Sequence, residues 1–265
     1  MKNNSEKQNN TIDSHIQMPK FILRQFEINN RFYYYDVEGD YIGNHGNAKT
    51  TNTYPNYYSN SIEIALNKEI ETPFSNFLKF VEKAINDGGV FQINDAQYDA
   101  AYNFIYALIA RSPAILKIIN NNSLFFQFMS EKDQHDFAVV NSIRAGIDRK
   151  MFGDYILSFL QNKTDIPFVL PVKGVYSIKT KDIDIIILPV QPKFAVLLIH
   201  RDYVHKIVSN GLINIALMDN EEQIMQCNLI AFAAQCKQNW GRVVSANKQL
   251  LNNLREEYHK IRFQN

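Results

Sequence analysis

The sequence predicts an α+β fold, in which a helical part comes first, a mainly antiparallel sheet follows and helices close the chain. Apolar residues recur at three- and four-residue steps over about 61–161, which is the period of amphipathic helices. Short runs rich in Val, Ile and Phe, separated by Gly, Pro, Lys and Asp, then occupy about 166–245. Because helices precede strands and a terminal helix follows at 246–261, we expect a single α+β domain over 15–265.

The N-terminal region divides into a polar tail and a first folded segment. Residues 1–14 are rich in Asn, Lys and Ser and offer too little apolar surface to offset the entropy of ordering them, so we expect a disordered tail. Residues 15–26 combine apolar side chains with one proline, and the alternating aromatic residues of 31–37 are typical of a strand. The stretch 38–60 holds several glycines, Pro55 and many Asn and Thr, which predicts a long loop.

Helices are expected next. The first covers 61–87 with Ser61 as its cap, and Pro73 should bend or divide it because proline lacks a backbone donor. The second begins at Asp95 and ends before Pro113. Weaker helical patterns occupy 114–128, 132–147 and 148–161.

The strand-like runs carry the sheet prediction. The run 183–190 is apolar on both faces, which indicates a strand inside the sheet. A helix, a strand and the terminal amphipathic helix follow at 221–236, 241–246 and 247–261. The other expected strands are 166–172, 174–178 and 193–199.

Composition and charge restrict the class of protein. The chain of 265 residues has 28 basic and 27 acidic side chains, so its net charge of +1 does not favour nucleic-acid binding by bulk charge, although a local basic patch stays open. Two cysteines make neither a disulfide framework nor a four-ligand zinc site, as is typical of a reducing cytosol. No stretch offers the roughly 18 apolar residues of a membrane span. We therefore expect a cytoplasmic protein without membrane association. The excess of Asn, Ile and Lys indicates AT-rich codons, and hence a bacterium or its phage.

An ordered series of short motifs resembles the domain of unknown function 4238 family. That family's signature opens with a histidine, a proline, an aromatic residue, a leucine and a phenylalanine. It continues with paired isoleucine–glutamate positions, an arginine-containing helix end, proline-bracketed strands and a late asparagine. The resemblance implies an order of elements and candidate positions but no reaction. The matching residues here are His15, Pro19, Phe21, Leu23, Arg24, Phe26, Ile62, Glu63, Ile70, Glu71, Arg111, Ser112, Pro113, Pro167, Phe168, Leu188, Pro189, Pro192 and Asn228.

The chain departs from the family pattern at two places. Ile16 stands where relatives commonly have a second histidine. The residues between Phe168 and Pro171 replace a serine–aspartate pair. If that pair is catalytic in the relatives, this chain has lost it or works differently.

Five residues form the catalytic candidate set: His15, Arg24, Glu63, Glu71 and Arg111. Histidine can act as a base near neutral pH, arginine can bind phosphate through two donors, and a carboxylate can hold a metal or accept a proton. Glu63 and Glu71 are eight residues apart, about two helical turns, so they can share one helix face. Arg111 closes another helix, where it can pair with either. The alternative interpretation is a buried ion network that fixes the helix pair to the N-terminal segment.

Two residues are substrate-binding candidates. Tyr34 belongs to an aromatic cluster that can supply stacking surfaces for a base or a sugar, with Phe32 on the same strand face and Tyr33 and Tyr35 on the other. Asn228 comes only from the resemblance. The sequence names no cofactor and predicts no metal site.

Two functions follow from these residues. The first is a phosphoester-hydrolysing, nuclease-like effector of a bacterial defence system or a mobile element, with His15 as acid or base and Arg24 and Arg111 as phosphate clamps. The second is a non-catalytic module that binds a protein partner through the tyrosine-rich loop and a sheet edge. An open pocket at the candidate residues favours the enzyme, and sealed ion pairs favour the module.

Overall fold

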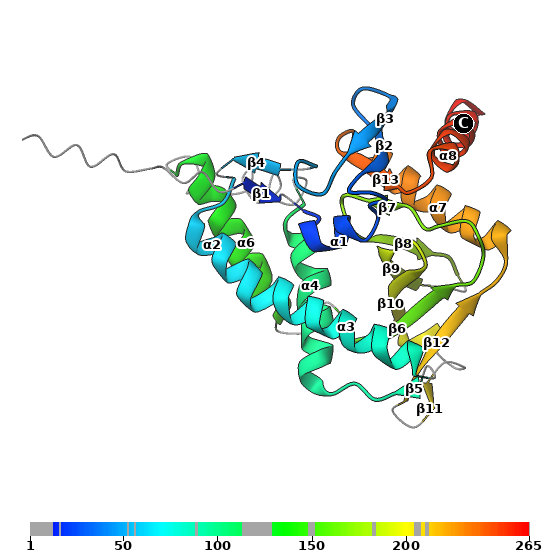
Figure 1. The fold of residues 1–265 in the computed structure, drawn as a ribbon. Helices are drawn as coiled ribbons and strands as arrows, with labels where there is room; N and C mark the ends of the chain where they lie inside the picture. Colours follow the sequence, from blue (N-terminus) through cyan, green and yellow to red (C-terminus); the bar gives the residue numbers. More distant parts are fainter. Residues whose placement is uncertain are drawn as a thin grey trace, which may run out of the picture.

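The chain folds into an α+β structure, as predicted, with helices before the main sheet and at the end of the chain (Figure 1). The fold is a computed structural model. It describes residues 13–15, 17–51, 53–55, 57–87, 90–112, 129–147, 152–181, 184–203, 208–209 and 212–264.

The largest sheet has seven strands in the order β11-β12-β6-β10-β9-β8, with β5 also paired to β12. Neighbouring strands are antiparallel except β12 and β6, which run parallel. In the middle strand β10, Val196 is opposite Phe159 on one side and Leu188 on the other. The strands are β5 (Val90–Phe91), β6 (Tyr155–Asn162), β8 (Tyr176–Lys179), β9 (Asp184–Gln191), β10 (Phe194–His200), β11 (Val208–Ser209) and β12 (Leu212–Met218), and a short 3-10 turn, η3 (Arg201–Tyr203), follows β10.

Strand β6 corrects the sequence prediction, which gave 148–161 as helical. Leu157 and Phe159 contact one apolar core and Leu160 contacts the other, so the strand is apolar on both faces. A run that is buried on both faces has no alternation, and its period does not distinguish a strand from a buried helix. Residues 148–151 lie outside the described part of the chain.

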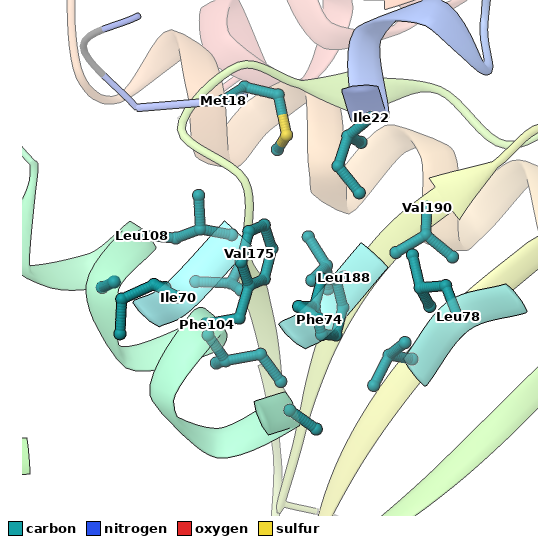
Figure 2. Close-up of a cluster of buried hydrophobic side chains, with 14 of the residues drawn as sticks. Met18, Ile22, Ile70, Phe74, Leu78, Phe104, Leu108, Val175, Leu188 and Val190 are labelled. Atoms are coloured by element: carbon teal, nitrogen blue, oxygen red, sulfur yellow. The ribbon is translucent and has the colours of Figure 1, made fainter. Parts of the chain in front are cut away.

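Helices cover one face of this sheet and form the first core with it. Its centre is shown in Figure 2, where Phe74 and Phe104 lie between Leu188 and Leu108. The two phenylalanine rings stack with centroids 3.9 Å apart, and both are fully buried. Burying such a ring contributes about 1.5–3 kcal/mol. The helices on this face include α1 (Lys20–Arg24), α3 (Thr72–Asn86) and α4 (Asp95–Ala110).

The second core lies between the opposite face of the sheet and the late helices. Phe232 of α7 (Glu221–Cys236) packs on Tyr35 with ring centroids 4.6 Å apart. Helix α8 (Lys248–Gln264) adds Leu251 and Leu254. Both cysteines are buried in this core. The strand and the two helices predicted after residue 220 are therefore confirmed, with α8 beginning at Lys248 rather than 246.

A four-stranded sheet links the two ends of the chain in the order β3-β2-β13-β7. The predicted alternation of the aromatic strand is confirmed, because Phe32 lies in the first core and Tyr35 in the second. Of the expected strand 166–172, only two residues pair in a sheet. The four strands are β2 (Phe32–Asp36), β3 (Tyr41–Gly46), β13 (Arg242–Ser245) and β7 (Leu170–Pro171).

The predicted loop at 38–60 is wrong over β3 and over β4 (Thr53–Pro55). The glycines that suggested a loop have another role. A Cβ at Gly43 would overlap the ring of Tyr34, and a Cβ at Gly46 would overlap the ring of Phe32. Glycine here allows close approach of two strands rather than a turn.

Strand β4 pairs with β1 (Asp13–His15), where His15 is opposite Thr53. The boundary of the predicted tail at residue 14 is therefore wrong, because Ser14 is fully buried within a strand. Residues 1–12 lie outside the described residues. Next to β4, the ring of Tyr57 stacks on His135 with centroids 4.1 Å apart, which connects this small sheet to α6 (Glu131–Ile147).

The first long helix has three parts, α2 (Asn60–Ala65), the π-helix η1 (Leu66–Glu71) and α3. Pro73 lies in the first turn of α3, so the predicted interruption is confirmed. The wide π turn accommodates the proline ring, which would otherwise meet a carbonyl of the preceding turn. The cap is Ser59 rather than Ser61, since the Ser59 hydroxyl accepts from the backbone N–H of Ile62 at 3.4 Å.

Helix α4 begins as predicted, at a capping box formed by Asn94 and Gln97. It ends at Arg111, its C-cap. The helix expected at 114–128 lies outside the described residues, whereas α6 confirms the one expected at 132–147.

Candidate functional site

An open groove of about 720 Å³ lies where the N-terminal segment meets the first long helix. One side comes from β1, α1 and the segment between β3 and β4. The other side is a continuous face of α2, η1 and the start of α3. The lining residues are His15, Lys20, Phe21, Arg24, Lys49, Glu63, Ile64, Asn67, Lys68, Glu71, Thr72 and Ser75.

Four of the five predicted catalytic residues line this groove. His15 comes from β1, Arg24 from α1, Glu63 from α2 and Glu71 from η1. Glu63, Asn67 and Glu71 follow one another at four-residue steps, so they share a helix face through the π turn, as expected for the two glutamates.

The fifth residue, Arg111, lies beneath the groove and is 1% exposed. Its Nη1 donates to Glu71 Oε1 at 3.1 Å, so it pairs with Glu71 rather than with Glu63. Its Nε and Nη2 atoms are buried and have no hydrogen-bond partner in the described part of the chain. A buried guanidinium with two unused donors costs free energy that a purely structural ion pair would avoid.

Glu63 is half-buried, and its Oε1 atom also lacks a partner among the described residues. Burial raises the pKa of the Glu63 carboxyl, although a hydrogen bond with Ser14 and the charge of Arg111 oppose this effect. The charges of Glu71 and Asp136 raise it further. The groove therefore favours the protonated, proton-donating form of Glu63 more than water does.

The position of His15 determines which ring nitrogen carries its proton. Nε2 lies 2.9 Å from the backbone oxygen of Ala48, which can only accept, so Nε2 donates and Nδ1 keeps its lone pair. Ala48 is itself held by a bond of 2.6 Å from its N–H to Glu27 Oε1. Burial lowers the pKa of His15, as do the charges of Lys20 and Arg111, while the Ala48 bond and the charge of Glu71 oppose the shift. His15 is thus held neutral with a basic nitrogen.

Four cationic side chains line the same groove: Lys20, Arg24, Lys49 and Lys68. They outnumber its two glutamates, so the groove is locally basic although the whole chain is near neutral. Sequence reasoning missed the three lysines. Lys20 directly follows Pro19 of the N-terminal motif, and Lys68 lies between Glu63 and Glu71, but only the fold brings Lys49 to the groove.

The two predicted substrate-binding residues do not line the groove. Arg242 covers the Tyr34 ring at 4.2 Å from its centroid. Asn228 is fully buried, accepts from the N–H of Val169 at 2.9 Å and donates to the carbonyl of Pro167 at 2.8 Å. The Asn228 amide therefore satisfies the backbone that leads into β7. Because neither Tyr34 nor Asn228 lines the groove, we leave both residues out of the proposed site.

The described residues contain no group of three or more His, Cys, Asp or Glu side chains placed to hold a metal ion. No described helix is long and apolar enough to cross a membrane. Comparison of the chain with protein families, curated proteins and solved structures returns no match. The resemblance to the domain of unknown function 4238 family stays a prediction.

Proposed function

We propose that the groove binds and cleaves a phosphate ester by general acid–base catalysis, as a nuclease-like enzyme does. The observation that carries this proposal is the meeting of His15, Glu63 and Arg24, which come from three separate elements, in one open groove lined by further cations. The open groove favours the enzyme alternative at His15, Arg24 and Glu63. Arg111 follows the alternative of a buried ion pair instead, and because it is 1% exposed it is not the phosphate clamp that the sequence predicted.

The two titratable side chains have complementary roles. His15 has a free lone pair on Nδ1 and accepts the proton of the nucleophile. Burial raises the pKa of Glu63, which makes its carboxyl a candidate for the acid that donates to the leaving oxygen. Opposite pKa shifts in two groups that line one groove are consistent with an acid and a base at one site.

The cations bind the phosphate. Arg24 presents a planar guanidinium that matches two phosphate oxygens, and Lys20 and Lys68 add charge on either side of the groove. Arg111 pairs with Glu71 at 3.1 Å from beneath the groove and so fixes the position of the Glu71 side chain in the groove wall. Glu71 is a positioning residue in this proposal, because its carboxylate is engaged by Arg111.

The experiment is a turnover assay of the purified protein on RNA, DNA and mononucleotides. His15→Gln is the informative variant, because the glutamine amide can still donate to the Ala48 carbonyl but has no basic nitrogen. We expect a loss of at least about 100-fold with the melting temperature preserved. His45→Ala is the control, since His45 lies in β3 and contacts Arg31 outside the groove. No turnover of any phosphate ester by the wild type contradicts the proposal.

A second candidate function is binding of a protein partner, and exposed tyrosines favour it. Tyr41 on the edge strand β3 is 46% exposed, and Tyr54 on β4 is 53% exposed. Tyrosine at a sheet edge is typical of protein interfaces. Co-purification of a partner that Tyr41→Ser and Tyr54→Ser release, together with no turnover, would support this function instead.

A further inference from the structure

The groove supplies one base, one acid and several cations. Phosphate esters differ in which of these groups their cleavage requires. Hydrolysis of DNA needs an external water as nucleophile, whereas RNA carries its own nucleophile, the 2′-hydroxyl beside the phosphate. An internal nucleophile has an effective concentration of about 10⁵–10⁸ M when it is well oriented. A groove with a single histidine base therefore suits RNA, because the base only has to take the proton of the 2′-hydroxyl.

The carboxylates of the groove are not arranged to attract a divalent cation. Glu71 is engaged by Arg111 at 3.1 Å. Lysine or arginine side chains line both sides of the groove, and burial raises the pKa of Glu63. The local field therefore suits an anionic backbone bound directly by side chains.

The groove also offers apolar surface between its charges. Ile64 is 63% exposed at the groove, and Phe21 lines it while packing on Phe104 with ring centroids 5.8 Å apart. Such surfaces contact bases or ribose in single-stranded nucleic-acid sites, while lysines follow the backbone.

From these contacts we infer that the substrate is RNA and that its own 2′-hydroxyl attacks the adjacent phosphorus. This inference rests on the proposed phosphoester cleavage. The 2′-hydroxyl proton passes to His15 Nδ1 as the bond from the 2′-oxygen to phosphorus forms. The bond from phosphorus to the 5′-oxygen breaks, and the Glu63 carboxyl protonates that oxygen. The products are a 2′,3′-cyclic phosphate and a free 5′-hydroxyl, and no oxidant, metal or second reactant takes part.

Four oligonucleotides of one unstructured sequence test this inference with EDTA present. They are an all-RNA strand, an all-DNA strand, a DNA strand with one ribonucleotide, and the same strand with that ribonucleotide 2′-O-methylated. We expect cleavage of the all-RNA strand and of the single-ribonucleotide strand, the latter only at its ribonucleotide. Mass spectrometry should find the cyclic phosphate as the first product.

The variants assign the chemistry to the groove. His15→Gln should reduce the rate on the single-ribonucleotide strand by at least about 100-fold. His45→Ala should stay within about twofold of wild type. If His15→Gln does not fold, Glu63→Gln replaces it, because that change keeps the size of the side chain and removes the proton donor.

The outcomes separate this inference from the proposed function. Cleavage of the all-DNA or 2′-O-methylated strand at a rate similar to RNA means a water nucleophile, which overturns the RNA inference and leaves phosphoester cleavage standing. Turnover of mononucleotides without cleavage of the single-ribonucleotide strand also overturns the RNA inference and leaves phosphoester cleavage standing. No turnover of any of these substrates overturns both.

Discussion

Two charged clusters of this molecule differ in how completely their polar atoms are paired. In the Asp40 cluster, which joins the β2–β3 turn to α8, one carboxylate oxygen of Asp40 accepts from Tyr35 Oη at 3.0 Å, Arg255 Nε at 2.8 Å and His259 Nε2 at 3.2 Å. In the groove, Glu63 Oε1 and two nitrogens of Arg111 are buried without partners in the described chain.

The difference indicates different roles. Three hydrogen bonds to one oxygen of a half-exposed carboxylate stabilise the fold. Unpaired buried donors and acceptors cost stability, and functional sites are one place where natural proteins tolerate such groups. The two clusters therefore predict opposite responses to substitution, with activity changing at the groove and stability changing at Asp40.

The largest effect is expected at Glu63. Glu63→Gln keeps the side-chain volume but removes the proton donor, so kcat should fall by about 10²–10³-fold. The free energy of unfolding should change by less than about 1 kcal/mol, because the fold already disfavours the charged carboxylate. Single-turnover cleavage and urea unfolding measure the two quantities. Equal activity in the variant would remove Glu63 from the acid role.

Arg111 should have the next largest effect. Arg111→Met fills the same space without polar atoms, so stability should be unchanged or higher, since a buried ion pair is often no better than an apolar side chain. Glu71 is 20% exposed and can be hydrated when its partner is lost. We expect kcat/KM to fall roughly tenfold, about the contribution of one hydrogen bond to a charged group.

Thermal melting and steady-state kinetics of Arg111→Met are the measurements. Severe destabilisation with residual activity proportional to the folded fraction would show that Arg111 serves the fold rather than the groove.

The pH dependence of kcat/KM should follow the two groove residues. His15 must be neutral to accept a proton, and burial holds its pKa below 6.5. Glu63 must be protonated to donate, and burial holds its pKa above 4.5. The rate should therefore fall in acid as His15 gains a proton and fall in alkali as Glu63 ionises. A profile without an alkaline limb, or an alkaline limb that Glu63→Gln leaves in place, is incompatible with these roles.

The smallest effect is expected at the Asp40 cluster. Asp40 has a φ of +48°, a conformation that asparagine tolerates, so Asp40→Asn removes the charge without backbone strain. The unfolding free energy should fall by about 1 kcal/mol or less, as for other exposed pairs, and the cleavage rate should not change.

The contacts of Asp40 also predict how its contribution to the unfolding free energy changes with pH. The Arg255 guanidinium, with Tyr35 and His259, lowers the pKa of Asp40 from 3.8 to about 2. The stabilisation is therefore present above about pH 4 and is lost as the pH falls through about 2. The difference in urea midpoint between wild type and Asp40→Asn should shrink steadily from pH 4 down through pH 2; a difference that does not change over this range contradicts the ion-pair origin.

Periodicity predicted the elements that have one apolar face. Helix α4, with its capping box at Asn94, and helix α3, with its buried apolar face, were found because local signals and tertiary packing agree there. Strand β6 was missed because it is buried on both faces, and β3 was missed because Gly43 and Gly46 read as turn residues. The deciding contacts of β6 are with β10 and β12, which are distant in the sequence, whereas β3 pairs with the neighbouring strand β2.

The candidate site was predictable in part. The spacing of Glu63 and Glu71 placed them on one helix face, and the N-terminal motif singled out His15 and Arg24. Nothing local indicated that Ala48 would fix the His15 tautomer, because that contact spans 33 residues. Asn228 came only from the resemblance, and its amide bonds to the backbone of Val169 and Pro167 instead of lining the groove.

The most direct test measures RNA cleavage and unfolding free energy side by side for Glu63→Gln and Asp40→Asn. We predict that Glu63→Gln loses at least about 100-fold in rate while keeping its stability within about 1 kcal/mol. Asp40→Asn should keep its rate within about twofold and lose only stability. If both variants lose activity only in proportion to their loss of folded protein, the groove is a structural cluster like that of Asp40, and the assignment of catalysis to it is wrong.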